Sequence, residues 1–447
     1  MPHSDAIAGA RSSPAAAARA QQFEARLLWA RAQDQADPLA PLRRRFALPR
    51  SPEGRALLYF CGHSLGPAPI AARALIEAEI EDWERHAALG HEQARSPWIG
   101  YAEQLQPDLA RLIGATPLEV VAMNSLSVNL HLLLASFYRP QPRRSAILIE
   151  AGAFPSDRHV VTAQIGWHGL DSARELIELA PRAGEELLRP EDIEQCIASN
   201  ASRLALVLWP GVQYRTGQYF DLPRIVRAAH AAGACIGLDL AHAIGNVPLA
   251  LHDDDADFAA WCSYKYLNAG PGALAGAFVH TRHLQRRDLP RLAGWWGQDP
   301  ATRFQMPAQF TPAAGAAGWA VSNPPIFSSA PLRASLPMFT EAGMPALRAK
   351  SMALNALFES LLLEFAPEEL TLVTPTDPAQ RGCQLSLRVR GSAARGRAVF
   401  QALARRAVVC DWREPDVMRF GLAPLYIGFE DVLRAAWQLC DALEESR

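Results

Sequence analysis

Only two of the chain's 44 basic residues are lysines, Lys265 and Lys350. A lysine can lose its proton and attack a carbonyl as a free amine, whereas an arginine stays charged at any accessible pH. Lys265 lies in Trp261-Cys-Ser-Tyr-Lys-Tyr-Leu-Asn-Ala-Gly-Pro-Gly272, where an aromatic-rich strand runs into a Gly/Pro turn. Lys350 falls in an apolar-periodic stretch, which predicts a position on the solvent-exposed edge of a helix. Lys265 is therefore the candidate for covalent chemistry.

Asp239 supplies a carboxylate that could act together with Lys265. It ends the apolar run that begins at Ala234, and a buried carboxylate there needs a cation or a hydrogen-bond donor. Lys265 follows 26 positions later (265 − 239), which leaves room for one connection and one further strand. A strand-end Asp followed by a strand-end Lys suits pyridoxal phosphate, because the Lys bonds the aldehyde and the Asp keeps the pyridine nitrogen protonated. The spacing equally allows an Asp that caps the next turn and a Lys at the surface.

Two further segments could hold parts of such a cofactor. Ser125-Leu-Ser127 precedes a predicted helix at 128–138, and N–H groups at a helix start bind phosphate together with hydroxyl groups. Simple capping of the helix by a serine is the alternative. Phe154 follows a predicted strand and could cover one face of an aromatic ring, although a single Phe is also a common core residue.

Other cofactor classes find less support in the sequence. Gly270-x-Gly272 lacks the third glycine of a dinucleotide fingerprint and lies after the lysine, so it predicts a turn and no NAD site. His280 and His283 have no Cys or acidic residue nearby in the sequence that would complete a metal-binding set. No metal site is therefore predicted.

The elements that must position these residues alternate between apolar strands and helices. Strands are predicted near 146–150, 204–208, 236–239, 258–264 and 274–280, with helices at 68–89, 99–113, 128–138 and 221–233. Strands separated by helices indicate a mostly parallel sheet covered on both faces, with its ligand site at the carboxyl ends of the strands. After about residue 330 the pattern predicts a long helix at 332–365, strands near 370–374, 384–390, 406–410 and 417–422, and a final helix from 429.

This pattern predicts three parts of the chain. Residues 1–58 form an N-terminal arm, with a loose tail to Ala20 and a helix at about 21–33. Residues 59–330 form a large cofactor-binding α/β domain, and residues 331–447 form a small C-terminal α+β domain.

Composition restricts the partners and the compartment. With 49% hydrophobic and 20% charged residues the chain can bury a large core, and its net charge of −2 argues against nucleic acid or an anionic membrane as the main partner. No apolar run approaches the ~20 residues that span a bilayer. The seven cysteines are scattered and form no Cys-x-x-Cys pair, which favours free thiols and a cytoplasmic location.

Seven segments of the chain resemble the kynureninase family. They are Gly62-His-Ser-Leu-Gly66, Gly90-His-Glu92, Phe154-Pro-Ser-Asp157, Asp239-Leu-Ala-His-Ala-Ile-Gly-Asn246, Cys262-Ser-Tyr-Lys-Tyr-Leu-Asn-Ala-Gly-Pro-Gly272, Gly294-Trp-Trp-Gly297 and Ser322-Asn-Pro-Pro325. They occur in the family's order, and the resemblance spans about residues 59–426. The Gly-Trp-Trp-Gly and Ser-Asn-Pro-Pro segments are the most specific. The resemblance implies a fold type I pyridoxal phosphate enzyme, whose large domain holds a mostly parallel seven-stranded sheet.

The resemblance also implies roles for single residues. Lys265 would bond the cofactor aldehyde, Asp239 would pair with the pyridine nitrogen, and Tyr264 would relay a proton at the substrate carbonyl. The other cofactor contacts would be Leu126, Ser127, Phe154, Asp157, His242, Trp295 and Asn323. In relatives the last two reach across from the other subunit of a homodimer.

Substrate contacts follow from the same resemblance. Arg419, in Asp416-Val-Met-Arg-Phe420, would clamp the substrate carboxylate with a planar guanidinium. His91, Ser64 and Asn323 would lie near the aromatic end of the substrate.

Three positions depart from the family pattern. His63 stands where an Asn is expected, which could alter the substrate pocket. Ser127 stands where Thr is common and keeps the hydroxyl. Pro210 replaces a Ser after a strand, and since proline has neither N–H nor hydroxyl, one cofactor contact is expected to be missing or replaced by water.

The activity implied is hydrolysis of L-kynurenine, or of 3-hydroxy-L-kynurenine, to anthranilate or 3-hydroxyanthranilate and L-alanine in tryptophan degradation. The alternatives are another fold type I enzyme, such as a cysteine desulfurase or a class V aminotransferase, and a non-catalytic ligand-binding regulator. A desulfurase needs a reactive Cys on a mobile loop, whereas Cys383 and Cys410 fall in predicted strands. The intact Lys265, Asp239 and Arg419 argue against a regulator.

Overall fold

The computed structural model describes residues 14–446 of the chain. Helix α1 runs over Pro14–Ala36 and is longer at both ends than the helix predicted at 21–33. The predicted loose tail to Ala20 is therefore wrong for residues 14–20, and its first thirteen residues lie outside the described part. None of the described helices is long and apolar enough to cross a membrane.

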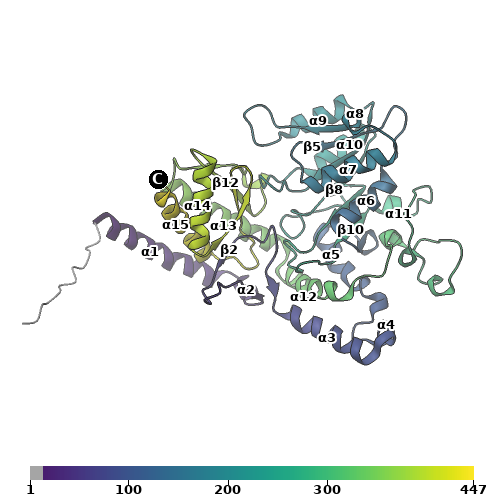
Figure 1. Cartoon of the computed structure of the whole chain (residues 1–447), viewed down its shortest axis with the longest axis horizontal. Coiled ribbons are helices and arrows are strands. Elements are labelled where there is room, and N and C mark those ends of the chain that lie inside the picture. Colours follow the sequence, from purple (N-terminus) through teal and green to yellow (C-terminus); the bar gives the residue numbers. More distant parts are fainter. Residues whose placement is uncertain (1–13, 447) are drawn as a thin grey trace, which may run out of the picture.

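A seven-stranded sheet forms the centre of the larger part of the molecule, to the right in Figure 1. Its order is β4-β10-β9-β8-β7-β5-β6, and only β10 runs antiparallel to its neighbours. The strands are β4 (Val120–Ala122), β5 (Ala146–Glu150), β6 (Leu176–Leu179), β7 (Leu204–Pro210), β8 (Cys235–Asp239), β9 (Phe258–Trp261) and β10 (Gly276–Val279). The prediction of a mostly parallel α/β sheet is confirmed.

Both faces of this sheet are buried, as the apolar runs predict. Successive residues of a strand point to opposite faces. Ile147 and Ile149 of β5 belong to one apolar core, and Leu148 between them belongs to the other. The covering helices include α5 (Gln106–Ile113), α6 (Leu126–Phe137), α7 (Pro155–Trp167), α9 (Pro190–Ser199) and α10 (Leu222–Ala231).

The C-terminal part is α+β, with one correction to the predicted helices. The single helix expected at 332–365 is two helices, α12 (Ile326–Ala342) and α13 (Met344–Phe365). Gly343 separates them with a φ of 73°, a left-handed conformation that favours glycine. The antiparallel sheet has the order β11-β12-β15-β14. Its elements are β11 (Leu370–Leu372), β12 (Gln384–Val389), β14 (Asp411–Arg413), β15 (Val417–Gly421), α14 (Ala393–Arg405) and α15 (Phe429–Glu445).

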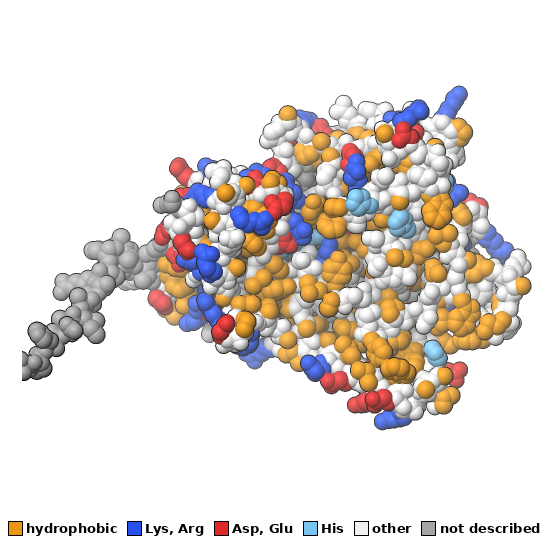
Figure 2. Space-filling view, in the orientation of Figure 1, with side chains coloured by type: hydrophobic (Ala, Val, Ile, Leu, Met, Phe, Trp, Pro, Cys, Tyr) orange, Lys and Arg blue, Asp and Glu red, His pale blue; other side chains and the backbone are white. Residues whose placement is uncertain are grey.

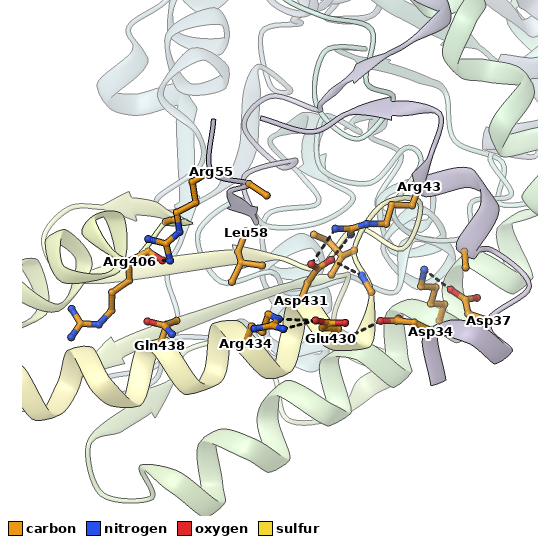
Figure 3. A pocket seen from close by; sticks show the side chains of 16 residues that line it. Asp34, Asp37, Arg43, Arg55, Leu58, Arg406, Glu430, Asp431, Arg434 and Gln438 are labelled. Atoms are coloured by element: carbon orange, nitrogen blue, oxygen red, sulfur yellow. Dashed lines mark hydrogen bonds and ion pairs between the residues drawn. The ribbon is translucent and has the colours of Figure 1, made fainter. Parts of the chain in front are cut away.

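The N-terminal arm is fastened to the C-terminal part. Strand β2 (Leu58–Tyr59) pairs in parallel with β13 (Val408–Val409), and α1 packs on α15. Figure 3 shows the cavity of about 510 Å³ between these elements, where Arg43 pairs with Asp431 and Arg434 pairs with Glu430. The Arg43–Asp431 pair joins the arm to α15, whereas Arg434–Glu430 is a pair within α15, so the role of these charges is structural.

Lys350 belongs to this joint, and its predicted exposure is wrong. It is buried on α13, and its Nζ lies 2.7 Å from Oδ2 of the equally buried Asp37. A lysine stem reaches from the helix to this carboxylate because α13 faces the arm.

Lys350→Met should lower the free energy of unfolding by about 3 kcal/mol, because it leaves the Asp37 carboxylate buried without its cation. Urea unfolding measures the difference. Arg73→Met is the matched control, since the Arg73–Glu77 pair is exposed and should contribute less than about 0.5 kcal/mol. An equal effect of the two substitutions would contradict this assignment.

Candidate functional site

A cavity of about 200 Å³ opens at the carboxyl ends of the parallel strands. Segments that follow β5, β7, β8 and β9 and the start of α6 supply its walls, as expected for a sheet of this kind. Its lining residues are Ser125, Leu126, Ser127, Glu150, Phe154, Ser156, Asp157, Pro210, Val212, Tyr214, Asp239, Ala241, His242, Tyr264 and Lys265.

Lys265 is buried in this cavity, so the surface alternative is wrong. Its side chain follows β9, and its Nζ lies 5.6 Å from the ring centroid of Phe154 and 5.9 Å from that of Tyr264. The segment carrying Lys265 is held close to Gly66, whose N–H donates to the Tyr264 carbonyl at 2.8 Å. A Cβ on Gly66 would lie 2.5 Å from the Lys265 carbonyl oxygen, so this approach requires glycine.

Asp239 reaches the same cavity from the neighbouring strand. Residue 239 pairs with Ala260 of β9, which brings the ends of β8 and β9 together. Asp239 Oδ1 also accepts the Ala241 N–H at 2.7 Å. Asp239 therefore caps the following turn and also lines the cavity, so both roles considered for it are present. One oxygen is thus fixed by the backbone, and the carboxylate is oriented into the cavity.

Two more carboxyl groups, Asp157 and Glu150, line the cavity. Burial and the negative charge of Asp239 raise the pKa of Asp157 well above its usual value. Burial likewise raises the pKa of Glu150 to about 8, with a contribution from Asp239. Three carboxyls facing one lysine cannot all ionise at low cost in a buried site. Glu150 and Asp157 therefore favour their protonated forms.

The start of α6 offers donors to a phosphate. Ser125 is the N-cap residue, yet its side chain makes no capping hydrogen bond, so the serine-cap alternative is wrong. The first N–H groups of a helix have no partner within the helix. Ser125, Leu126 and Ser127 line the cavity at this point, which leaves N–H and hydroxyl donors facing it.

Aromatic and imidazole rings surround the remaining space. Phe154 packs edge-on against Tyr214, with ring centroids 5.2 Å apart. His242 is buried, and its Nδ1 has no hydrogen-bond partner among the described residues. Burial and the nearby Lys265 lower the pKa of His242 well below its usual value, so the imidazole is neutral. An aromatic ring with polar substituents fits these donors and faces, and pyridoxal phosphate is such a group.

Arg419 lies behind this cavity and does not line it. The guanidinium is fully buried on β15, and it donates to the Tyr214 carbonyl and to Asp411 Oδ2, both at 2.6 Å. His63 stands 3.7 Å from the same Asp411 oxygen. Burial lowers the pKa of His63 to about 3, so this ring is neutral too.

Four predicted site residues lie elsewhere on this chain. Trp295, Asn323, Ser64 and His91 do not line the cavity, and all four are exposed. Conversely, Glu150 and Tyr214 line it although sequence reasoning did not single them out. Glu150 ends an apolar strand just as Asp239 does, so the same signal could have found it. Pro210 also lines the cavity and faces it without a donor.

A group of possible metal-binding atoms lies apart from the cavity. It consists of Glu119, His252 and His280, whose possible ligand atoms all lie within 4.8 Å of one another. His280 therefore has an acidic neighbour in the folded chain that its sequence neighbourhood did not show. Glu119 accepts the Thr281 N–H at 2.8 Å and contacts His252 Nδ1 at 2.9 Å, and its lone pairs are engaged inside the protein.

The fold and the cavity define a class, the fold type I pyridoxal phosphate enzymes. Solved structures of the same fold include the Escherichia coli cysteine desulfurase CsdA, with a TM-score of 0.73, 17% identity and coverage of 91% of this chain and 98% of that chain. A C-DES variant with glycine covalently linked to its PLP cofactor has a TM-score of 0.72 at 19% identity, over 89% of this chain and 99% of that one.

The sequence comparisons are more specific. A family model described as the kynureninase C-terminal domain matches residues 347–439. The chain is 55% identical to the kynureninase of Xanthomonas campestris pv. campestris strain B100, over 90% of this chain and 95% of that protein. It is also 55% identical to that of Stenotrophomonas maltophilia strain K279a, over 89% and 94%. The chain belongs to the kynureninase family.

Proposed function

We propose that the chain catalyses the hydrolysis of L-kynurenine, or of its 3-hydroxy derivative, to anthranilate or 3-hydroxyanthranilate and L-alanine. The observation that carries this proposal is the convergence of Lys265 and Asp239 in one buried cavity, in a chain 55% identical to curated kynureninases over 90% of its length. Bound pyridoxal phosphate supplies an aldehyde carbon and a conjugated ring that accepts electrons from the substrate.

Cofactor binding divides among the walls of the cavity. Ser127 and the N–H groups at the start of α6 would hold the phosphate, because the helix dipole favours an anion there. Phe154 would cover one face of the ring, and Asp239 would pair with the ring nitrogen. Asp157 and His242 would contact its polar edge.

Proton movements fall to two neighbouring residues. The Lys265 amine takes the proton from the substrate α-carbon, a task that requires a base able to exist uncharged. Burial raises the pKa of the Tyr264 phenol well above its usual value, so it stays protonated and can donate to the substrate carbonyl oxygen. Water then adds to this carbonyl, and the β–γ carbon bond breaks with its electron pair left on the β-carbon. The carbonyl carbon leaves as the carboxyl group of the aromatic acid, the β-carbon takes up a proton, and Lys265 returns a proton to the α-carbon to give L-alanine.

The substrate carboxylate is assigned to Arg419, with one condition. Two nitrogens of its guanidinium already bind Asp411 and the Tyr214 carbonyl, while Nε has no partner among the described residues. The substrate carboxylate therefore has to join or replace one of these contacts. His63 lies near the Asp411 oxygen that binds Arg419, so it is assigned to this contact. Ser64 and His91 are assigned to the aromatic end of the substrate.

The active enzyme is proposed to be a homodimer. Figure 2 shows apolar side chains across the face that carries α3 (Ala71–His86) and α12. Ile70 and Trp83 are each more than half exposed, and Phe327 packs on Trp83 with ring centroids 5.9 Å apart. An apolar surface of this kind marks a protein interface. Trp295 and Asn323, which are exposed on this chain, are assigned to the cavity of the partner subunit.

A cytoplasmic location is proposed from the thiols. No disulfide links any of the seven cysteines, which all lie in the described part of the chain, and unlinked thiols are typical of a reducing compartment. Cys383 and Cys410 were predicted inside strands, whereas each lies one residue before a strand, β12 and β14 respectively. Both cysteines are buried. Burial raises the pKa of Cys383 to about 12, which removes the reactive thiolate that a desulfurase needs.

The purified protein, loaded with pyridoxal phosphate, tests the proposal directly. Addition of L-kynurenine should release fluorescent anthranilate and one equivalent of L-alanine, and 3-hydroxykynurenine should be assayed in parallel. L-Cysteine with sulfide detection is the control for the desulfurase alternative. Visible absorbance of the bound cofactor without cleavage of either kynurenine would contradict the proposed reaction and leave the cofactor assignment standing.

A further inference from the structure

Glu150 lies in the wall between two cavities. Its buried carboxyl at the end of β5 lines the cofactor cavity and also a second cavity of about 270 Å³. Charged and amide side chains line this adjoining cavity together with apolar ones, and it reaches the surface at the exposed Gly152 and the half-buried Glu186. Glu150 is thus the one carboxyl of the cofactor cavity that also lines this second cavity.

The neighbouring amide of Gln213 is fixed in orientation towards Glu150. Gln213 Oε1 accepts the N–H groups of Arg215 and Thr216 at 2.6 and 2.9 Å. Its Nε2 must therefore point the other way, where it donates to Glu150 Oε1 at 3.3 Å and to the Gly152 carbonyl at 3.4 Å. A long hydrogen bond from an amide that also donates to a second acceptor stabilises a buried negative charge only weakly.

The three acids of the cofactor cavity differ in their partners. Asp239 accepts a short backbone N–H bond, and Asp157 accepts the Ser156 hydroxyl at 3.2 Å, while burial and the charge of Asp239 raise the pKa of Asp157 well above its usual value. Among the described residues, the Glu150 carboxyl accepts a side-chain hydrogen bond only from the Gln213 amide. The charged and titratable groups facing Glu150 across the two cavities are Asp157, Asp239, His242, Tyr214, Tyr264, Lys265, Glu185, Glu186 and Arg215.

We propose that Glu150 is a positioning residue that holds a proton in the same cavity as Asp239 and exchanges it with water through the adjoining cavity. Its neutral carboxyl adds no charge beside Asp239, the proposed partner of the cofactor ring. When Glu150 loses its proton, a negative charge appears in the cavity that holds the cofactor. The inference uses the proposed function only in assigning Asp239 to the ring nitrogen, and it holds whichever substrate the enzyme cleaves.

The sign of the effect follows from charge. Burial raises the pKa of Glu150 to about 8, so the carboxyl is neutral below this pH and negative above it. A negative charge favours the protonated state of its neighbours. The ionised Glu150 should therefore raise the pH at which the bound cofactor loses its proton. Removing this negative charge should lower that pH.

The test is a pH titration of the cofactor's visible absorbance in the holoenzyme without substrate. Glu150→Gln keeps the size and the neutral state, so its spectrum should match the wild type below about pH 7, and its alkaline midpoint should fall by about 1 unit. Glu150→Asp retains an ionisable group and should keep a midpoint near the wild-type value. Gln213→Met removes the amide bond that lowers the Glu150 pKa, so its midpoint should move towards that of Glu150→Gln.

Infrared difference spectra give an independent readout. The wild type should lose one protonated-carboxyl band near pH 8, and Glu150→Gln should lack this band. Identical midpoints in the wild type, Glu150→Gln and Gln213→Met would overturn the proposal. A failure to cleave kynurenine leaves this titration unaffected, so the two proposals fail separately. If Glu150→Gln does not fold, Gln213→Met and the infrared band of the wild type decide the question.

Discussion

Replacing Lys265 by alanine should abolish the release of anthranilate from L-kynurenine. The amine both bonds the cofactor aldehyde and takes the substrate α-proton, and a positioned base alone contributes about 10²–10⁴-fold to a rate. Lys265 is the only lysine that lines the cofactor cavity, and the other lysine, Lys350, is bound to Asp37. The described cavity therefore contains no substitute amine.

Lys265→Arg separates the role of the free amine from the role of the positive charge. Arginine keeps the positive charge in the cavity yet cannot supply a free amine, so it should be as inactive as alanine. Single-turnover formation of anthranilate and the visible absorbance of the bound cofactor measure the two roles. Substantial turnover by either variant would refute the assignment of Lys265.

Mixing two inactive variants should restore activity if the active sites are shared between subunits. Lys265→Ala damages one side of a site, and the double variant Trp295→Ala/Asn323→Ala damages the side proposed to come from the partner. In a two-fold symmetric dimer mixed at random, half of the dimers are hybrids and each hybrid has one intact site, so about a quarter of the wild-type activity should return.

The matched control is Lys265→Ala mixed with Asp239→Asn. Both changes lie in the same cavity, so each site of a hybrid retains one lesion and no activity should return. The subunits are exchanged by mild denaturation and refolding, and light scattering establishes the dimer before the assay. Absence of recovery in the first mixture, with hybrids present, would contradict a shared site.

The sequence determined the strands that carry the chemistry. The apolar runs ending at Glu150 and Asp239 are strands β5 and β8 with the same last residues, because a buried strand between helices needs a continuous apolar stretch. Sequence analysis missed α7 and α9, although both begin with a proline in the first turn, at Pro155 and Pro190. The apolar pattern of α7 is weak, whereas α9 buries Ile193 and Ile197 four residues apart and could have been found.

Boundaries set by one residue were harder to predict. Apolar periodicity continues through Gly343, so it predicted one helix where the left-handed backbone of that glycine makes two. Lys350 has the spacing of an exposed helix edge, and only the N-terminal arm packed against α13 buries it beside Asp37. The helix break is thus set by the backbone of one residue, whereas the burial of Lys350 is decided by a neighbour distant in sequence.

The sequence by itself therefore fixed which residues can do chemistry and which strand ends carry them, because side-chain chemistry and strand patterns are local properties. The tertiary structure alone decided which of them meet. It placed Glu150 and Asp239, 89 positions apart (239 − 150), in one cavity, and it buried Arg419 behind Tyr214 in contact with Asp411. Such meetings depend on how strands are ordered in a sheet and how the C-terminal part packs on it, and no local pattern encodes either.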